Sequence, residues 1–282
     1  MSYQLFYLEH LSDRDVDLLA GASGDPDSVR ARLSADPGVV DELLTNPALF
    51  EMVFEAPDAE LGVPLSPFLA FGILVNRVAH DVEHVNYTYE WNGPGQRIPV
   101  FDVGSLRDFM ADGARRYFLI ELLASFTKVA SGRVWVRTRR GYRSRRFSEL
   151  DPVHLSEMVE QLPVAQQPAG FRRLGDVALF LSGVFPDHTA RNPPAPFHRE
   201  RLTRSAGVEP MLALQADDSL DFHEALGAAW YRKAVEVAVA QVGAGPPMLR
   251  DVADNFRPAR RVLNYLADRY LHHYDAGLSR PA

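Results

Sequence analysis

Residues Phe171–Phe185 read FRRLGDVALFLSGVF, a strongly apolar run that stops immediately before Pro186. The residue that precedes a proline is disfavoured in helical conformation, so the pair Phe185-Pro186 marks the end of a helix. A helix that is apolar on most of its faces is buried rather than solvated. We therefore expect a buried helix over these residues.

Helix starts are marked at several points of the chain before this run. A Ser, Asp or Asn directly before a proline combines a capping side chain with a residue suited to the first helical turn. Such starts, and one capping box, occur at Ser12–Asp15, Asp25-Pro26, Asp36-Pro37, Asn46-Pro47, Ser66-Pro67 and Asp151-Pro152. The helix that begins at Ser66 should reach about Trp91, where Asn92-Gly-Pro-Gly95 stops it. Apolar spacing predicts further helices over residues 105–129, 219–242, 248–256 and 258–274.

These patterns predict a mainly α fold: a compact, bundle-like globule of many helices with one small β-hairpin near residues 133–147. A chain of 282 residues lies within the range of a single core, so we expect one helical domain over residues 1–282. An alternative division joins residues 1–131 and a hairpin at 132–148 in one half and places residues 149–282 in the other. The regular strand–helix alternation of a doubly wound sheet is missing.

Composition narrows the classes of function. Cysteine is absent, which excludes disulfide scaffolds, thiolate metal sites and cysteine nucleophiles. A net charge of −7 and a pI near 5.7 argue against a surface built throughout for nucleic acid. No apolar run approaches the roughly 20 residues that cross a bilayer, and the first residues lack a secretory signal pattern. We therefore expect a cytoplasmic protein that does not engage membranes.

A histidine pair stands on the helix predicted to begin at Ser66. His80 and His84 are four residues apart, so they lie on one helical face and can share a metal ion. The run from His80 to His84 also resembles the His-x-x-Glu-His signature of the inverted zinc peptidases. The resemblance implies that both histidines are metal ligands and that Glu83 is the general base acting on zinc-bound water.

The remaining ligand of such a site must come from elsewhere in the chain, and Glu157 or Glu160 stands at a suitable distance along the sequence. A divalent metal held here would support hydrolase chemistry or, with a second ion, oxidase chemistry. The alternative is structural. His80 and His84 lie away from the apolar stripe of their helix, where imidazoles are partly exposed or hydrogen-bonded at a helix–helix contact.

The apolar pattern changes its period between Gly132 and Phe147. The residues Val134-Trp-Val136 favour a strand and Arg140-Gly141 is a turn signal, so the segment predicts a two-stranded hairpin. Seven arginines and two aromatic residues crowd it: Arg133, Arg137, Arg139, Arg140, Arg143, Arg145, Arg146, Trp135 and Tyr142.

Arginine at this density favours a binding role for the hairpin. Guanidinium groups bind phosphate or carboxylate through paired donors, and an exposed Trp or Tyr can stack on a base. We therefore expect these nine residues to bind an anionic small molecule, nucleic acid or an acidic protein surface. The alternative is a solvated hairpin whose charges discourage strand pairing and neutralise nearby carboxylates such as Glu149 and Asp151.

Several short runs carry a resemblance that covers most of the chain. They are Ser66-Pro-Phe68, Arg97-Ile-Pro-Val-Phe101, Glu121-Leu-Leu-Ala-Ser125, Arg145-Arg-Phe-Ser-Glu-Leu-Asp151 and Leu174-Gly-Asp-Val-Ala-Leu-Phe-Leu-Ser-Gly183. With these runs the chain resembles a family of uncharacterised actinobacterial helical proteins. The resemblance implies a taxonomic setting and supplies no catalytic residues.

Three hypotheses for the function follow from these patterns. The leading one is a helical binding or regulatory protein that engages an anionic ligand or acidic partner through the arginine-rich hairpin. The second is a metal-dependent enzyme centred on His80, Glu83 and His84. The third is a structural subunit of a larger assembly.

Overall fold

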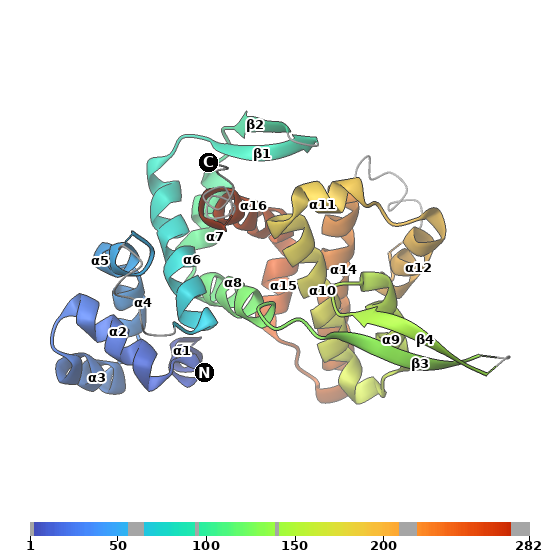
Figure 1. Cartoon of the computed structure of the whole chain (residues 1–282), viewed down its shortest axis with the longest axis horizontal. Helices are drawn as coiled ribbons and strands as arrows, with labels where there is room; N and C mark the ends of the chain where they lie inside the picture. Colours follow the sequence, from blue (N-terminus) through green and yellow to red (C-terminus); the bar gives the residue numbers. More distant parts are fainter. Residues whose placement is uncertain (1–2, 56–64, 94–95, 139–140, 209–218, 272–282) are drawn as a thin grey trace, which may run out of the picture. The chain divides into compact units, whose positions relative to one another are not determined.

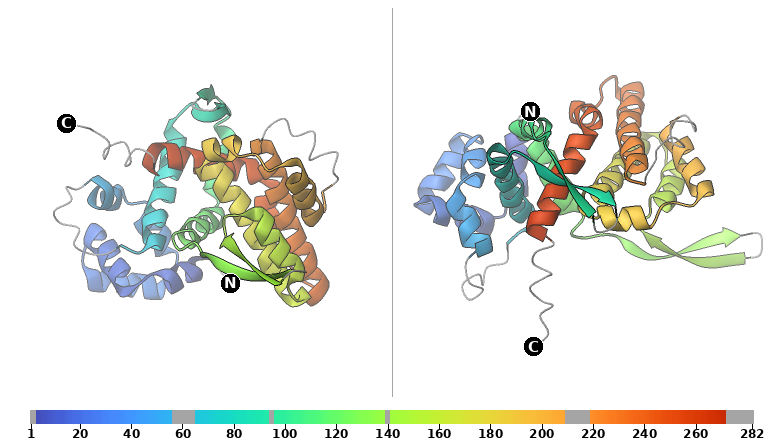
Figure 2. Two further views of the ribbon diagram at one scale, coloured as in Figure 1. Left: turned by 45° about the vertical axis from the view of Figure 1, so that its right-hand side comes forward. Right: turned by 90° about the horizontal axis from the view of Figure 1, so that it is seen from above.

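The computed structural model describes residues 3–55, 65–93, 96–138, 141–208 and 219–271. These residues are mainly helical, as the sequence predicts, and the chain divides into two compact units. Unit 1 comprises Met1–Thr88, Val100–Thr127 and Asp268–Ala282, and unit 2 comprises Tyr89–Pro99 and Lys128–Ala267. Figure 1 labels the elements, and Figure 2 shows them from two further sides. None of the described helices is both long enough and apolar enough to span a membrane.

Unit 1 consists of short helices packed with one long helix, α6. Its elements are α1 (Tyr3–His10), α2 (Asp13–Ser23), α3 (Pro26–Ala35), α4 (Val39–Leu44), α5 (Pro47–Phe50), the π-helix η1 (Glu51–Glu55), α6 (Pro67–His84), α7 (Gly104–Ala111) and α8 (Gly113–Ser125). Apart from Ala267, the π-helix η3 (Ala267–Leu271) belongs to the same unit. Side chains that α6 and α8 bury, including Leu69, Val78, Val82 and Leu119, supply much of its core.

The predicted caps account for the starts of α2, α3, α5 and α6. Ser12 and Asp15 form a complete capping box, and the side chains of Asp25, Asn46 and Ser66 each accept a backbone N–H of the following helix. The start predicted at Asp36-Pro37 is displaced, because the Asp36 side chain accepts from Gly38 N (2.8 Å) and α4 begins at Val39.

The helix predicted to reach Trp91 is shorter than expected, because α6 ends at His84. Its C-cap residue, Val85, has extended backbone angles (φ −107°, ψ 147°). Arg107 donates from Nε to Val82 O (2.8 Å) and from a terminal nitrogen to Val85 O (2.7 Å). A guanidinium therefore satisfies carbonyl groups that the end of the helix leaves open.

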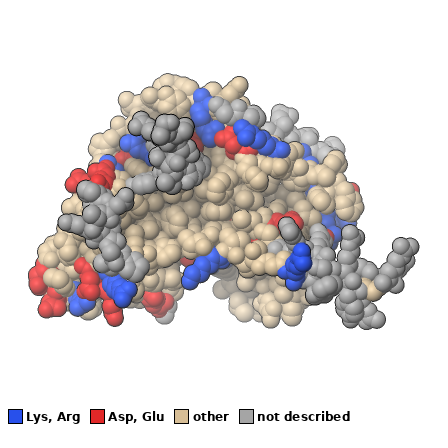
Figure 3. All heavy atoms as spheres, in the orientation of Figure 1, with Lys and Arg blue, Asp and Glu red and all other residues tan. Residues whose placement is uncertain are grey.

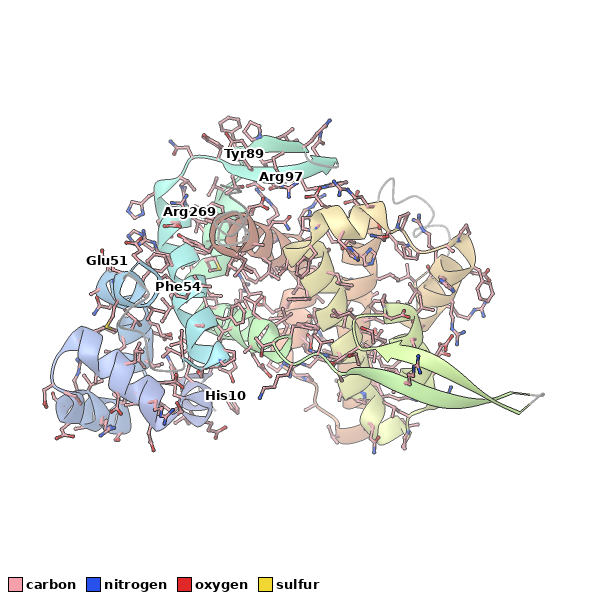
Figure 4. The ribbon with its side chains drawn as sticks, in the orientation of Figure 1. His10, Glu51, Phe54, Tyr89, Arg97 and Arg269 are labelled. Carbon is pink, nitrogen blue, oxygen red and sulfur yellow. The ribbon has the colours of Figure 1, made fainter. Side chains whose placement is uncertain are left out.

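A second hairpin, which the sequence patterns do not predict, occupies the residues after α6. It pairs β1 (Thr88–Gly93) with β2 (Gln96–Val100). Gly93, at φ +147°, has a backbone conformation that favours glycine near the turn. Trp91 Nε1 and Arg97, which is labelled in Figure 4, donate to the two carboxylate oxygens of Asp187 at 2.9 and 3.1 Å. These bonds attach the hairpin, most of which belongs to unit 2, to the helices of that unit.

The helices of unit 2 pack around the pair formed by α10 and α14. Its elements are β3 (Ser131–Thr138), β4 (Gly141–Ser148), α9 (Pro152–Gln161), the 3-10 helix η2 (Val164–Gln166), α10 (Gln167–Val184), α11 (Pro186–Arg191), α12 (Pro196–Ala206), α14 (Ser219–Val242), α15 (Pro247–Asp254) and α16 (Phe256–Leu266). The buried helix predicted over Phe171–Phe185 is confirmed as α10.

Glycines allow the close approach of α10 to its neighbours. A Cβ atom at Gly175 would lie 2.5 Å from the ring of Tyr231, and one at Gly183 would lie 2.7 Å from Leu263 Cβ. The hydroxyl of Tyr231 donates to Asp176 Oδ1 (2.8 Å), which gives the buried carboxylate a partner at the same contact. Burial and the adjacent Asp176 carboxylate raise the pKa of Tyr231 well above its usual value, so the phenol stays protonated.

Candidate functional site

The predicted arginine-rich hairpin is present as β3 and β4, residues 131–148, which we call the arginine arm. The strands are antiparallel and in register from Ser131 opposite Ser148 to Thr138 opposite Gly141. In the described part of the chain they pair only with each other. Figures 1 and 2 show their far ends reaching beyond the helices of unit 2. The arm is therefore a two-stranded ribbon with two open edges.

The register gives the positions of the predicted binding residues. Arg133 stands opposite Arg146, and Arg137 opposite Tyr142, while Trp135, Arg143 and Arg145 face Ser144, Val136 and Val134. The side chain of Arg133 is exposed. Arg139 and Arg140 lie outside the described residues, as do the side chains of Trp135, Arg137, Tyr142, Arg143, Arg145 and Arg146.

The base of the arm is closed by Glu149, the residue after β4. Glu149 N donates to Ala130 O (2.9 Å), and Ala130 N donates back to Glu149 Oε2 (3.1 Å). Arg173 of α10 donates from Nε to the other carboxylate oxygen at 2.5 Å. Burial alone would raise the pKa of Glu149, but the bonds from Arg173 and Ala130 and the Arg173 charge hold it below its usual value. The arm is thus anchored to α10 through an ionised carboxylate.

The two carboxylates nearest the arm in sequence have partners outside it. Glu149 binds Ala130 and Arg173, and Asp151 Oδ1 accepts the backbone N–H groups of Val153 and His154 at 3.0 and 3.2 Å as the cap of α9. Each of the two carboxylates named in that alternative thus has a described partner outside the paired strands.

Over α2 and α3 of unit 1, basic and acidic side chains are mixed. On the face shown in Figure 3, carboxylates gather over α2 and α3 with arginines among them. Arg30 pairs with Asp17, and Arg32 pairs with Glu42 at 2.8 Å. Since each of these cations has a carboxylate partner on its own surface, this part of unit 1 is a poor anion site.

The predicted metal ligands His80 and His84 lie side by side at the end of α6. Their ring centroids are 4.5 Å apart, and Nδ1 of His84 hydrogen-bonds with His80 O (2.8 Å). Both histidines and Glu83 are exposed. The proposed third ligands, Glu157 and Glu160, belong to unit 2, where both face Arg201. Within the described ranges, no three His, Asp or Glu side chains are placed so that they could hold a metal ion.

The buried member of this motif is Asp81, which no sequence pattern distinguishes from its neighbours. Its carboxylate accepts from the hydroxyl of Tyr270 and lies 3.3 Å from Nε of Arg77 and 3.3 Å from Nε of Arg269. Arg269 is labelled in Figure 4. Burial and the bond to Asp81 raise the pKa of Tyr270. Asp81 therefore fastens η3 to α6, which is a structural role.

A group of residues that the sequence patterns do not bring together surrounds a cavity of about 330 Å³ in unit 2. His188 of α11, His198 of α12 and His223 of α14 all line it, together with Asp151 and Asn192. These residues come from distant parts of the sequence and share no motif, so no local signal could have identified them.

Comparison with known proteins supplies no function: the chain matches no protein-family model, no curated protein sequence and no solved structure. The resemblance to actinobacterial helical proteins stays a prediction. The chemistry of the arginine arm and of the histidine pair on α6 therefore carries the functional argument.

Proposed function

We propose that this chain is a helical binding protein that engages an anionic partner through the arginine arm. The proposal rests on one observation: positive charge is concentrated on a single two-stranded ribbon. Residues 131–148 contain seven arginines and no Asp, Glu or Lys. Since the whole chain carries −7 and this segment carries +7, the remaining residues carry −14. The arm and the rest of the chain thus attract partners of opposite sign.

The register adds a physical reason for a bound anion. Arg133 and Arg146 occupy directly opposite positions on the two strands. Like charges in such positions destabilise a strand pair. An anion that bridges two guanidinium groups removes this repulsion, because each guanidinium offers paired donors to phosphate or carboxylate. The arrangement is costly for a purely structural ribbon and useful for one that binds anions.

The shape of the arm favours an extended partner. Each strand has eight residues, which corresponds to roughly 25 Å at about 3.3 Å per residue. The major groove of DNA admits a two-stranded ribbon, and arginine contacts phosphates and guanine edges. Nucleic acid is therefore the first partner to test, and an acidic protein surface is the second.

The test compares binding of three labelled probes by fluorescence anisotropy: a short DNA duplex, a short single-stranded RNA and polyglutamate. The arm variant carries Arg137→Ala, Arg143→Ala and Arg145→Ala. The control variant removes the same charge at three exposed helical positions with Arg14→Ala, Arg191→Ala and Arg250→Ala. We expect the arm variant to lose affinity for at least one probe by roughly tenfold or more, and the control by much less. An equal loss in both variants for every probe would contradict the proposal.

A further inference from the structure

His80 and His84 form an exposed pair at the C-terminal end of α6. Their ring centroids are 4.5 Å apart, and the ring planes are inclined to each other by 30°. The His80 side chain is 58% exposed, and His84 is exposed as well. Both residues belong to unit 1, whereas the arginine arm belongs to unit 2. The two imidazoles are therefore accessible from solution and close enough to bind one ion together.

A backbone carbonyl fixes the tautomer of His84. Nδ1 of His84 lies 2.8 Å from His80 O. Because a carbonyl oxygen only accepts hydrogen bonds, Nδ1 carries the proton of the neutral ring, and the nitrogen lone pair is on Nε2. Among the residues that the structure describes, Nε2 of His84 has no hydrogen-bond partner. The bond to the carbonyl therefore leaves Nε2 available as a metal ligand.

A buried carboxylate faces the equivalent nitrogen of His80. Nδ1 of His80 lies 3.9 Å from Oδ1 of Asp81, whose exposed fraction is 7%. Arg77 and Arg269 each lie 3.3 Å from this carboxylate and keep it ionised and in place. The negative charge favours the proton of the neutral ring on Nδ1, which again leaves the lone pair on Nε2. Asp81 thus faces the ring of His80 in addition to fastening η3.

These second contacts are typical of histidines that bind metal ions. A metal-binding histidine uses one ring nitrogen as the ligand and turns the other N–H to a carboxylate, a backbone carbonyl or water. His80 faces a carboxylate in this way, and His84 a backbone carbonyl. Two ligand nitrogens at about 2.0–2.1 Å from a common ion lie roughly 3–4 Å apart. Rings whose centroids are 4.5 Å apart can meet this spacing through their Nε2 atoms.

Among the described residues, the pair supplies two ligands and no third. No group of three His, Asp or Glu side chains in those ranges could hold a metal ion. Structural and catalytic zinc sites have four and three protein ligands, so a two-histidine site holds its ion less tightly and leaves positions for water or a dissolved ligand. Imidazole suits Cu²⁺, Ni²⁺ and Zn²⁺, whereas Mg²⁺ and Ca²⁺ prefer oxygen ligands. The pair therefore favours an exchangeable transition-metal ion.

We propose that His80 and His84 chelate one divalent transition-metal ion through the Nε2 atoms of both rings. Water or a dissolved ligand occupies the other coordination positions. The affinity follows the general order of divalent ions at nitrogen ligands, in which Cu²⁺ binds more tightly than Ni²⁺ or Zn²⁺. The site uses no residue of the arm, so it stands whether or not the arm binds an anionic partner.

The test titrates the full-length chain, without an affinity tag, with the chlorides of Cu²⁺, Ni²⁺, Zn²⁺ and Mg²⁺. Binding is measured by calorimetry at pH 7.5, above the ordinary histidine pKa of about 6.5. We expect Cu²⁺ to bind with a dissociation constant on the order of 10 µM or tighter, Ni²⁺ and Zn²⁺ more weakly, and Mg²⁺ not measurably. The electron paramagnetic resonance spectrum of the Cu²⁺ complex should show coupling to two imidazole nitrogens. Absent saturation by Cu²⁺, or Mg²⁺ binding of equal affinity, would overturn the proposal.

Three variants localise the ion. His80→Ala and His84→Ala each remove one ligand from an exposed position, so each should weaken Cu²⁺ binding by about tenfold or more and leave coupling to a single imidazole nitrogen. His10→Ala is the matched control, because His10 is also exposed, its Nδ1 lies 2.8 Å from Phe6 O, and no histidine stands four residues away. Unchanged Cu²⁺ affinity in His80→Ala or His84→Ala, or an equal loss in His10→Ala, would refute the site. The arm variant should bind Cu²⁺ normally, which separates this test from that of the arm.

Discussion

Nε of Arg173 lies 2.5 Å from Oε1 of Glu149, and this ion pair joins α10 to the residue that follows β4. The other oxygen of the same carboxylate accepts from Ala130 N, just before β3. One side chain therefore holds both ends of the arginine arm and fastens them to α10. The orientation of the arm depends on this carboxylate, because the arm has no third strand among the described residues.

Glu149→Gln should weaken this anchor. The substitution removes the charge but keeps the shape, and both partners are only about one-fifth exposed. We expect the free energy of unfolding in urea to fall by about 1 kcal/mol. The matched control is Glu200→Gln, which breaks the exposed pair with Arg204, and it should cost less than about 0.5 kcal/mol. Equal effects of the two substitutions would show that the anchor is no stronger than a surface pair.

The contribution of Glu149 should also depend on pH in a defined direction. Its pKa in the folded protein lies below the ordinary value of 4.5. A depressed carboxyl pKa contributes stability that is fully present above the unfolded pKa and is lost as the pH falls through the folded pKa. The difference in stability between the wild type and Glu149→Gln should therefore be constant near neutral pH and shrink below about pH 4.5. A difference that grows in acid would refute this assignment.

Gly175→Ala should destabilise unit 2 by overpacking. The added methyl group would lie 2.5 Å from the buried ring of Tyr231, so α10 and α14 must separate or the ring must move. Overpacking of this kind costs about 1–3 kcal/mol. Gly21→Ala in α2 is the control, because no atom lies within 4 Å of the added Cβ, and alanine there should be neutral or stabilising. Thermal unfolding of the two variants distinguishes these outcomes, and a neutral Gly175→Ala would count against the close packing.

Within the His80–His84 run, Asp81 should matter for stability and the histidines should not. Asp81→Asn removes the charge that faces Arg77, Arg269 and the Tyr270 hydroxyl. We expect a loss of about 2 kcal/mol, below the cost of breaking a fully buried pair because both guanidinium groups are partly exposed. His80→Ala and His84→Ala should each change stability by less than about 0.5 kcal/mol. A larger loss in the histidine variants than in Asp81→Asn would reverse the roles assigned to them.

Local sequence patterns correctly predict those structural elements that depend only on their own residues. The helix predicted over residues 219–242 coincides with α14, and the hairpin predicted near 133–147 is confirmed as β3 and β4. The caps at Ser12, Asp25 and Asn46 act through backbone groups within three residues. Such features can be found from sequence because no distant partner decides them.

Other features depend on contacts that local patterns do not contain. The end of α6 at His84 depends on Arg107. Its guanidinium donates hydrogen bonds to the carbonyl groups of Val82 and Val85, more than twenty residues earlier in the chain. The cavity in unit 2 requires α11, α12 and α14 to place His188, His198 and His223 around one space. Asp81 stands in a motif that suggested metal chemistry, and only its burial beside η3 shows its structural role.

The most direct test of the account is the salt dependence of binding to a short DNA duplex. For the wild type and the arm variant, the logarithm of the binding constant is plotted against the logarithm of the salt concentration. Each lost phosphate contact reduces the slope by about 0.9. We predict that removal of Arg137, Arg143 and Arg145 lowers the magnitude of the slope by roughly 2–3, while the control variant keeps the slope of the wild type. Identical slopes for all three proteins would show that the arginine arm does not contact nucleic acid, and the same identity with polyglutamate would contradict the proposed function.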